Sequence, residues 1–308
     1  MPNTAINTPP NVQTLIDNIL EANPMHRKFL DHSMADIQEE ELHHLDRYLS
    51  FCTEQGLTLS YMAESYLTIV EDTLREQIYF MKHKNYRHSS YQDVANDVYH
   101  NDEYMNRYMY GLAMTAFLWP NHLGMARFFN ETLPRDRKGH YLEIGPGHGY
   151  YIMSAMQSAA FDHFTGIDIS ESSIKQSRSI IDYFAPECKD RYALRCMDFL
   201  DANNLEENSF DSIVMGEVLE HVETPDIFLQ RIASLAKKDA FIFITTCVNA
   251  PAIDHIYLWR TTADLEEMIE DNGLKITKPL RLPYEGKTLE ESEAEDLAIN
   301  VAYVLEKA

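Results

Sequence analysis

The sequence predicts an α/β fold: a doubly wound, mostly parallel sheet of seven strands with helices on both faces, preceded by an all-helical region. From residue 140 onward, short runs rich in β-branched and aromatic residues alternate with helical stretches of about 10 to 15 residues, which is typical of right-handed βαβ crossovers. Before that point, apolar residues recur at helical spacing with almost no glycine. We therefore expect a helical region over residues 1–134 and a sheet region over 135–308.

Three helical segments make up most of the first region. The first covers residues 37–56, where Gly56 is a typical C-cap, and the second covers 58–83. The third covers 104–133 and is apolar on nearly all sides until Pro120 interrupts it. We treat the first dozen residues as loose.

The second region is expected to contain five strands followed by a pair. The five strands are residues 140–145, 163–169, 192–199, 210–216 and 240–247. The helices expected between and after them are residues 150–160, 170–185, 224–238 and 262–273. Residues 277–307 break the alternation and predict two final strands, compatible with an antiparallel pair, around a solvated acidic loop.

Composition excludes several classes of protein. Asp and Glu total 49 against 26 Lys and Arg, a formal net charge of -23, so the surface repels nucleic-acid phosphates and anionic lipid. The N-terminus lacks the pattern of a signal peptide, and no apolar run approaches the roughly 18 residues of a membrane span. The four cysteines are widely separated and lack metal-ligand spacing, as expected of free thiols in a reducing compartment. We expect a cytoplasmic protein without nucleic acid, membrane span or metal, and we allow for a homodimer.

A glycine-rich loop follows the first expected strand, in the stretch YLEIGPGHGYYI. Gly145, Gly147 and Gly149 would let a ligand approach the backbone at the carboxyl end of the sheet, where open α/β sheets bind ligands. The dinucleotide fingerprint GxGxxG does not fit, because the third glycine comes two residues after the second and Tyr150 stands where that fingerprint has glycine. A tight turn is the alternative.

The spacing GxGxG, with an acid two residues before the first glycine, resembles motif I of the class I S-adenosylmethionine-dependent methyltransferases, which have a Rossmann-like fold. The resemblance continues with Asp168 after the second strand and with Asp198 and Phe199 after the third. The segment FDSIVMGEVLEHVETP, which begins at Phe210, matches the fourth-strand motif of the ubiquinone and menaquinone biosynthesis branch. The resemblance covers roughly residues 135 to 275.

This resemblance implies S-adenosylmethionine as cofactor and assigns roles to motif residues. Glu143 would meet the ammonium group, Asp168 the ribose hydroxyls, Asp198 the adenine amino group and Phe199 the adenine ring. A carboxylate suits a diol because it accepts two hydrogen bonds. The implied cofactor residues are Glu143, Gly145, Gly147, Gly149, Asp168, Ile169, Asp198, Phe199, Gly216 and Glu217.

Residues near the ends of the fourth and fifth strands are candidates for handling the acceptor. His221 lies one helical turn after Glu217 and could take a proton near neutral pH. After the fifth strand, an expected loop supplies His255 and Tyr257 as further catalytic candidates. For both histidines, an ordinary structural role is the open alternative.

Aromatic residues are candidates for the acceptor pocket, because Tyr and Met side chains suit an apolar substrate. The expected substrate residues are Tyr104, Tyr108, Trp119, His122, Tyr150, Tyr151 and Asn249. We expect methyl transfer to a small molecule, with oxygen or carbon favoured over nitrogen, and a helical region that closes the pocket. Two alternatives stay open: a protein or carrier-bound acceptor, and a nonenzymatic scaffold that binds S-adenosylmethionine.

Overall fold

The computed structural model describes residues 8–94 and 102–308. The chain divides into two compact units by its internal contacts. The first combines Met1–Asp72 with Asn106–Leu123, and the second combines Thr73–Met105 with Gly124–Ala308. The division at residue 134 that follows from the change in sequence pattern stays a prediction about domains.

The first unit is helical. It contains α1 (Pro10–Ala22), α2 (Arg27–Asp36) and α3 (Glu39–Glu54), while α4 (Leu59–His83) and α6 (Asp102–Leu118) contribute residues to both units. Helix α1 packs against α3 and begins at Pro10, within the first dozen residues that the sequence predicts to be loose. Its apolar residues recur at helical spacing and are buried: Val12, Leu15, Ile19 and Leu20.

Helix boundaries follow local chemistry. Helix α3 begins with a capping box formed by Gln38 and Glu41, and Gly56 beyond its end has a φ of 87°, as expected of a C-terminal glycine. Pro120 starts a new helix, α7 (Pro120–Thr132), because proline is tolerated in the first turn but not in a helix interior.

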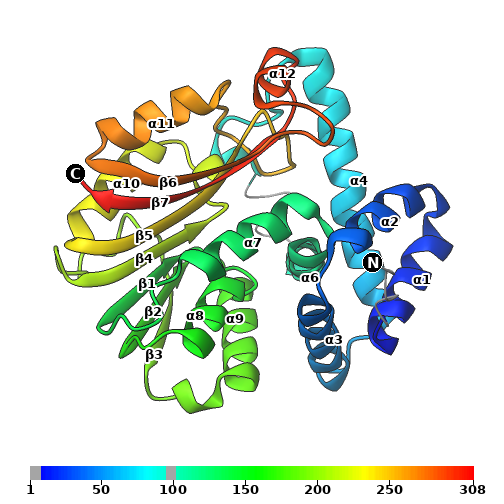
Figure 1. Ribbon diagram of the computed structural model, residues 1–308, viewed down its shortest axis with the longest axis horizontal. Coiled ribbons are helices and arrows are strands. Elements are labelled where there is room, and N and C mark those ends of the chain that lie inside the picture. Colours follow the sequence, from blue (N-terminus) through cyan, green and yellow to red (C-terminus); the bar gives the residue numbers. More distant parts are fainter. Residues whose placement is uncertain (1–7, 95–101) are drawn as a thin grey trace, which may run out of the picture. The chain divides into compact units, whose positions relative to one another are not determined.

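The second unit contains a seven-stranded sheet in the order β3-β2-β1-β4-β5-β7-β6 (Figure 1). The strands are β1 (His140–Ile144), β2 (His163–Asp168), β3 (Tyr192–Cys196), β4 (Phe210–Gly216), β5 (Ala236–Val248), β6 (Leu274–Leu282) and β7 (Ile299–Lys307). The first five pair in parallel, and β7 pairs antiparallel with both β5 and β6. The predicted α/β fold and the antiparallel final pair are confirmed.

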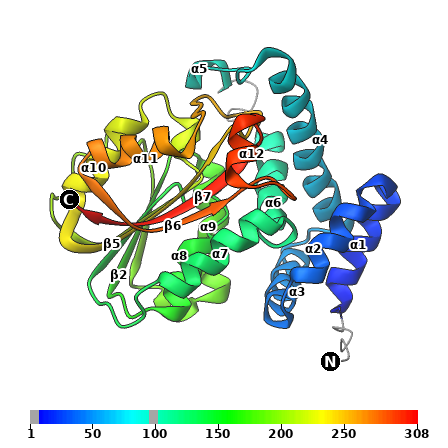
Figure 2. The ribbon, with the colours of Figure 1, turned by 45° about the horizontal axis from the view of Figure 1, so that its top comes forward.

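Helices cover both faces of this sheet. Alternate residues of each strand enter opposite cores: on β1, Leu142 and Ile144 join one core and Tyr141 joins the other. Helices α10 (Pro225–Leu235) and α11 (Thr262–Asp271) cover the first core. Helices α7, α8 (Tyr150–Ser158) and α9 (Glu171–Phe184) cover the second core. In Figures 1 and 2, α10 and α11 lie side by side on their face.

Three details differ from the expectation. The helix expected over 224–238 ends at Leu235, and β5 begins at Ala236. The acidic segment expected as a solvated loop contains a short helix, α12 (Leu289–Ala294), which Thr288 and Glu291 cap reciprocally. A four-residue helix, α5 (Tyr91–Val94), lies in the stretch before α6.

Within residues 8–94 and 102–308, no helix combines the length and apolar composition that a membrane crossing needs.

Candidate active site

The glycine loop joins β1 to α8 and requires glycine at each of its three positions. Gly145, Gly147 and Gly149 have φ values of 67°, 53° and 77°, which side chains rarely adopt. A Cβ atom on Gly145 would lie 2.5 Å from Cγ2 of Val218. A turn alone explains the backbone conformation, so the case for a ligand depends on the side chains around the loop.

Asp168, at the end of β2, is tied to this loop. Its two carboxylate oxygens accept hydrogen bonds from the amides of Gly147 (3.1 Å) and Ser170 (2.8 Å). Burial raises the pKa of Asp168 to about 6, although these amide hydrogen bonds act in the opposite direction. Each oxygen keeps a further lone pair, so the carboxylate can still accept hydrogen bonds from a diol.

Glu143, on β1 beneath the loop, is almost fully buried at 1% exposure. The hydroxyl of Tyr141 donates a hydrogen bond of 2.5 Å to its Oε2 atom. Burial raises the pKa of Glu143 to about 8; the Tyr141 hydrogen bond lowers it and the charge of Asp168 raises it further. Near pH 7 the carboxyl is therefore mostly neutral in the free protein.

The residues that follow β2 and β3 differ in how far their side chains are exposed. Asp198 is exposed and accepts a hydrogen bond from the Leu200 amide (2.8 Å). Phe199 is only 4% exposed and packs in the core against Phe228, with ring centroids 5.4 Å apart. Ile169, by contrast, is 49% exposed. Of these two apolar residues, Ile169 therefore presents its side chain to solvent, whereas Phe199 is buried.

At the end of β4, the chain turns sharply at Glu217. Its φ is 52°, and its amide donates to the carbonyl oxygen (3.0 Å) and the hydroxyl (3.1 Å) of Thr245 on β5. A Cβ on Gly216 would lie 2.6 Å from the Tyr151 ring, so glycine is needed before this turn. Burial and the charge of Glu220 raise the pKa of Glu217 well above its usual range.

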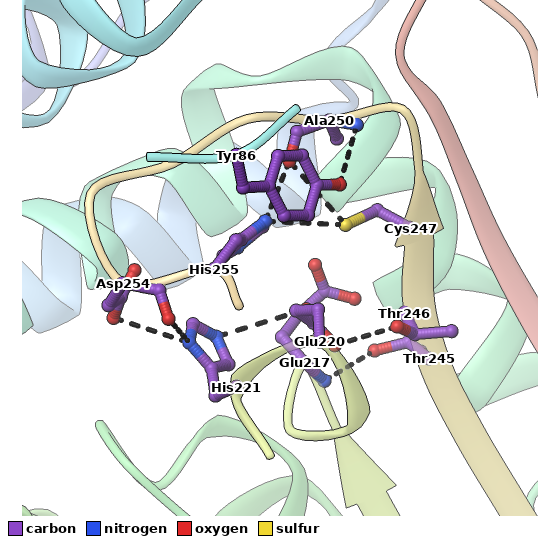
Figure 3. A network of polar contacts seen from close by, with 10 residues as sticks. All are labelled: Tyr86, Glu217, Glu220, His221, Thr245, Thr246, Cys247, Ala250, Asp254 and His255. Carbon is purple, nitrogen blue, oxygen red and sulfur yellow. Dashed lines mark hydrogen bonds and ion pairs between the residues drawn. The ribbon is translucent and has the colours of Figure 1, made fainter. Parts of the chain in front are cut away.

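Glu220 and His221 follow in a short 3-10 turn, η4 (Leu219–His221), and belong to the polar network in Figure 3. Glu220 is fully buried, and the Thr246 hydroxyl donates a 2.7 Å hydrogen bond to its Oε2 atom. His221 Nδ1 lies 3.1 Å from the carbonyl oxygen and 3.4 Å from Oδ2 of Asp254. Burial lowers the pKa of His221, but the charges of Asp254 and Glu220 outweigh it, so the net pKa is raised.

His255 lies across from His221, with ring centroids 4.7 Å apart and nearly perpendicular planes (Figure 3). Its Nδ1 atom is 2.6 Å from the carbonyl oxygen of Ala250 and 3.7 Å from the Cys247 sulfur. Burial, and secondarily the charge of His221, lowers the pKa of His255. The network therefore holds one histidine that favours the charged form and one that favours the neutral form.

Comparison with known proteins agrees with this geometry. A family model described as "Methyltransferase domain" matches residues 135–294. The chain belongs to this family. The resemblance to class I methyltransferases seen in the sequence is thereby confirmed, and with it S-adenosylmethionine as cofactor.

Curated relatives of this methyltransferase match over part of their length. It is 31% identical to the ubiquinone biosynthesis O-methyltransferase of Neisseria meningitidis serogroup C (strain 053442) over 111 residues, 36% of this chain and 44% of the relative. It is 25% identical to the mitochondrial ubiquinone biosynthesis O-methyltransferase of Dictyostelium discoideum over 169 residues, 48% of this chain and 47% of the relative. The matched stretches thus span less than half of each of these relatives.

A solved structure shares the fold at low sequence identity. The Haemonchus contortus phosphoethanolamine N-methyltransferase 2, in complex with phosphomonomethylethanolamine and S-adenosylhomocysteine, superposes with a TM-score of 0.53. The two chains are 15% identical, and the superposition covers 71% of this chain and 60% of the other.

Two further residues expected near the acceptor are found in the loop after β5. Asn249 is fully buried with a φ of 51°, and its Nδ2 atom donates to the carbonyl oxygen of Arg260 (2.9 Å). Tyr257 is partly exposed, and its ring lies 4.6 Å from that of Trp259. Asn249 thus holds the base of the loop, and the acceptor roles of both residues stay predictions.

The expected aromatic substrate residues are divided between the two units. Tyr151 contacts Phe129 (4.8 Å) and Phe243 (5.8 Å) within the core of the methyltransferase's sheet unit. The Tyr150 hydroxyl accepts a hydrogen bond from Asn130 (3.4 Å). Tyr104, on α6, belongs to the sheet unit and is partly exposed.

Tyr108, Trp119 and His122 belong to the helical unit. Tyr108 is buried at 6% exposure. Trp119 donates to the Tyr66 hydroxyl (3.2 Å), and His122 Nδ1 lies 3.0 Å from the Thr115 hydroxyl. Their contribution to acceptor binding stays a prediction.

Several members of the network are absent from the sequence-based list of site residues. Glu220 lies in the fourth-strand motif, and Asp254 directly precedes His255, so both could have been found by extending the candidates to their neighbours. Thr246 and Cys247 lie within β5, and the sequence gives no sign that their side chains reach the site. The Tyr86 hydroxyl accepts a hydrogen bond from the Ala250 amide (3.1 Å), a contact between residues 164 positions apart.

Proposed function

We propose that this methyltransferase transfers the methyl group of S-adenosylmethionine to an oxygen atom of a small, hydroxyl-bearing molecule. The observation that carries the proposal is the polar network of Glu217, Glu220, His221 and His255, in which Glu220 is fully buried and the other three are partly exposed. This network follows β4 and β5 at the same end of the sheet as the glycine loop. A hydroxyl acceptor loses a proton during methylation, and such a network can receive it. The Neisseria and Dictyostelium relatives are O-methyltransferases, which supports oxygen over carbon or nitrogen.

The residues present fit the cofactor. Asp168 is held against the glycine loop by the Gly147 amide (3.1 Å) and keeps lone pairs for a diol. Gly145 and Gly216 allow close packing beside the loop, because a Cβ atom at either position would clash with Val218 or Tyr151. Asp168 would accept hydrogen bonds from the ribose hydroxyls and Glu143 would face the ammonium group, while Asp198 would meet the adenine amino group. Ile169 would offer apolar surface to the purine. When bound, S-adenosylmethionine supplies an electrophilic methyl carbon on a sulfonium.

The histidines have complementary properties for the acceptor. His255 has a lowered pKa and is therefore mostly neutral near pH 7, as a proton acceptor must be. His221 would position it, with Asp254 holding the His221 ring. Orienting an acceptor oxygen in line with the methyl carbon and excluding water would supply much of the rate. Closure of the pocket by the helical region is part of the proposal.

The decisive experiment measures formation of S-adenosylhomocysteine with a panel of phenols, alcohols, carboxylic acids and amines. The proposal expects turnover with a hydroxyl compound, and loss of turnover when only that hydroxyl is replaced by hydrogen. Label that stays with macromolecules would support the protein or carrier alternative. Tight cofactor binding without turnover of any compound would support the scaffold alternative.

A further inference from the structure

Glu220, His221 and His255 bring three potential metal ligands together. One carboxylate oxygen and one nitrogen from each imidazole all lie within 4.8 Å of one another. His221 Nε2 is 3.9 Å from Glu220 Oε1, which is too long for a hydrogen bond. Around a tetrahedral ion with bonds near 2.0–2.1 Å, ligand atoms are about 3.4 Å apart, so modest side-chain rotation would close the group on a cation.

Both histidines are held with the same ring nitrogen available. A carbonyl oxygen can only accept, so Nδ1 of His255 must donate its proton to the Ala250 carbonyl at 2.6 Å. By the same argument, Nδ1 of His221 donates to the carbonyl of Asp254, with the Asp254 carboxylate 3.4 Å away. Each neutral ring then carries its lone pair on Nε2. Metal-binding histidines are typically oriented in this way, by a carbonyl or carboxylate on the other nitrogen.

Glu220 is arranged in the same manner. Its Oε2 atom is held by the Thr246 hydroxyl at 2.7 Å. Its Oε1 atom is buried and has no hydrogen-bond partner among the residues that the structure describes. An unpaired carboxylate oxygen in a fully buried side chain carries a large desolvation cost unless something compensates its charge.

We propose that Glu220 Oε1, His221 Nε2 and His255 Nε2 bind one divalent transition-metal cation of the zinc class. Two imidazoles and one carboxylate suit such an ion, and three protein ligands leave a coordination position open. The sequence-based expectation of no metal rested on cysteine spacing, whereas this site is built from histidines and glutamate in two segments that the fold brings together.

The role of the cation extends the proposed function and depends on it. The binding of the cation does not depend on that function. A hydroxyl oxygen in the open position would become more acidic and would be fixed next to the cofactor loop. In the metal-loaded protein, His255 would act as a ligand and the cation would assist loss of the acceptor proton. The substrate class thereby narrows to compounds with a hydroxyl that can reach a cation.

Cobalt(II) is a suitable probe, because its visible absorption reports coordination geometry. The full chain is first freed of metal with a chelator and then titrated with Co²⁺ in wild type, Glu220→Gln, His255→Gln and the control His83→Gln. His83 is an exposed histidine on α4. We expect one Co²⁺ per chain, affinity weakened by about tenfold or more in both ligand variants, and no change in the control. Unchanged affinity in the ligand variants, or no saturable binding, would overturn the proposal.

Two further measurements keep this test independent of folding and of turnover. Thermal unfolding and S-adenosylhomocysteine affinity of each variant establish that the fold is intact. X-ray absorption of the zinc complex of the wild-type chain should show two imidazoles, oxygen ligands and no sulfur; a spectrum without imidazole would contradict the assignment even if the variants do not fold. Metal binding without methylation of any hydroxyl compound would refute the proposed function alone, whereas full turnover by metal-free protein would refute the role of the cation alone.

Discussion

The carboxylate of Asp168 accepts a 3.1 Å hydrogen bond from the amide of Gly147, which joins the end of β2 to the glycine loop that follows β1. One acid thus fixes the loop conformation and keeps lone pairs for a ligand. Replacing it with alanine should weaken S-adenosylhomocysteine binding by about tenfold or more, because the ribose loses a charged acceptor. Calorimetric titration measures this, with Asp190→Ala as control, since Asp190 is an exposed acid before β3. Equal affinities in the two variants would remove the ribose assignment.

Glu143 should release a proton when the cofactor binds. Its pKa of about 8 leaves the carboxyl mostly protonated at pH 7, and a cationic ammonium group beside it would favour the ionised form. Titrations at pH 7 in buffers of different ionisation enthalpy count the protons released. We expect net release in wild type and little or none in Glu143→Gln. Release of the same number of protons by both proteins would show that Glu143 does not interact with the ammonium group.

The same pKa predicts a pH effect on stability. The folded-state pKa is raised above the usual value of 4.5, so between these values the unfolded state loses a proton that the folded state keeps. This group's contribution to stability is therefore largest below pH 4.5 and falls as pH rises towards 8. Urea unfolding across this range should show a smaller loss of stability in Glu143→Gln than in wild type. If the stabilities of the two proteins change with pH in parallel, Glu143 is not a buried, neutral carboxyl.

Gly145 and Gly286 allow the steric and backbone costs of alanine to be separated. Both have positive φ, 67° and 77°, but a Cβ at Gly145 would lie 2.5 Å from Val218, whereas at Gly286 it would meet nothing within 4 Å. We expect Gly286→Ala to lower the free energy of unfolding by about 1–2 kcal/mol, and Gly145→Ala to lower it further and to weaken cofactor binding. Chemical denaturation and calorimetry measure both quantities. Identical losses of stability would mean that Val218 moves aside without cost.

Ile169 and Phe199 should separate cofactor contact from core packing. Phe199→Ala removes a 4% exposed ring from the core and should cost about 3–5 kcal/mol of stability. Ile169→Ser changes a 49% exposed side chain and should weaken cofactor binding with little effect on unfolding. Paired unfolding and binding measurements distinguish the two. A Phe199→Ala variant that stays stable but binds the cofactor weakly would assign the adenine contact to Phe199.

The sequence was informative where a side chain's role depends on its neighbours along the chain. The alternation of strands and helices predicted the sheet. The motifs identified Glu143, Asp168 and Glu217, which lie at or near the carboxyl ends of β1, β2 and β4. The burial of Phe199 could not be predicted, because a motif position does not reveal which way a side chain points when the strand ends, and its contact with adenine stays a prediction. The contact of Tyr86 with Ala250, and of Thr246 with Glu220, depends on folding of distant segments and leaves no local pattern.

The position of β7 has a consequence for biosynthesis. This strand is inserted between β5 and β6, so it supplies hydrogen-bond partners to both of them although it follows them in the chain. Until β7 emerges from the ribosome, β5 exposes an unpaired edge next to a nearly complete parallel sheet, and β6 has no neighbour at all. Such an edge is a template for association with other nascent chains. A chain that ends before residue 299 would therefore leave the apolar edge of β5 open to association with other chains.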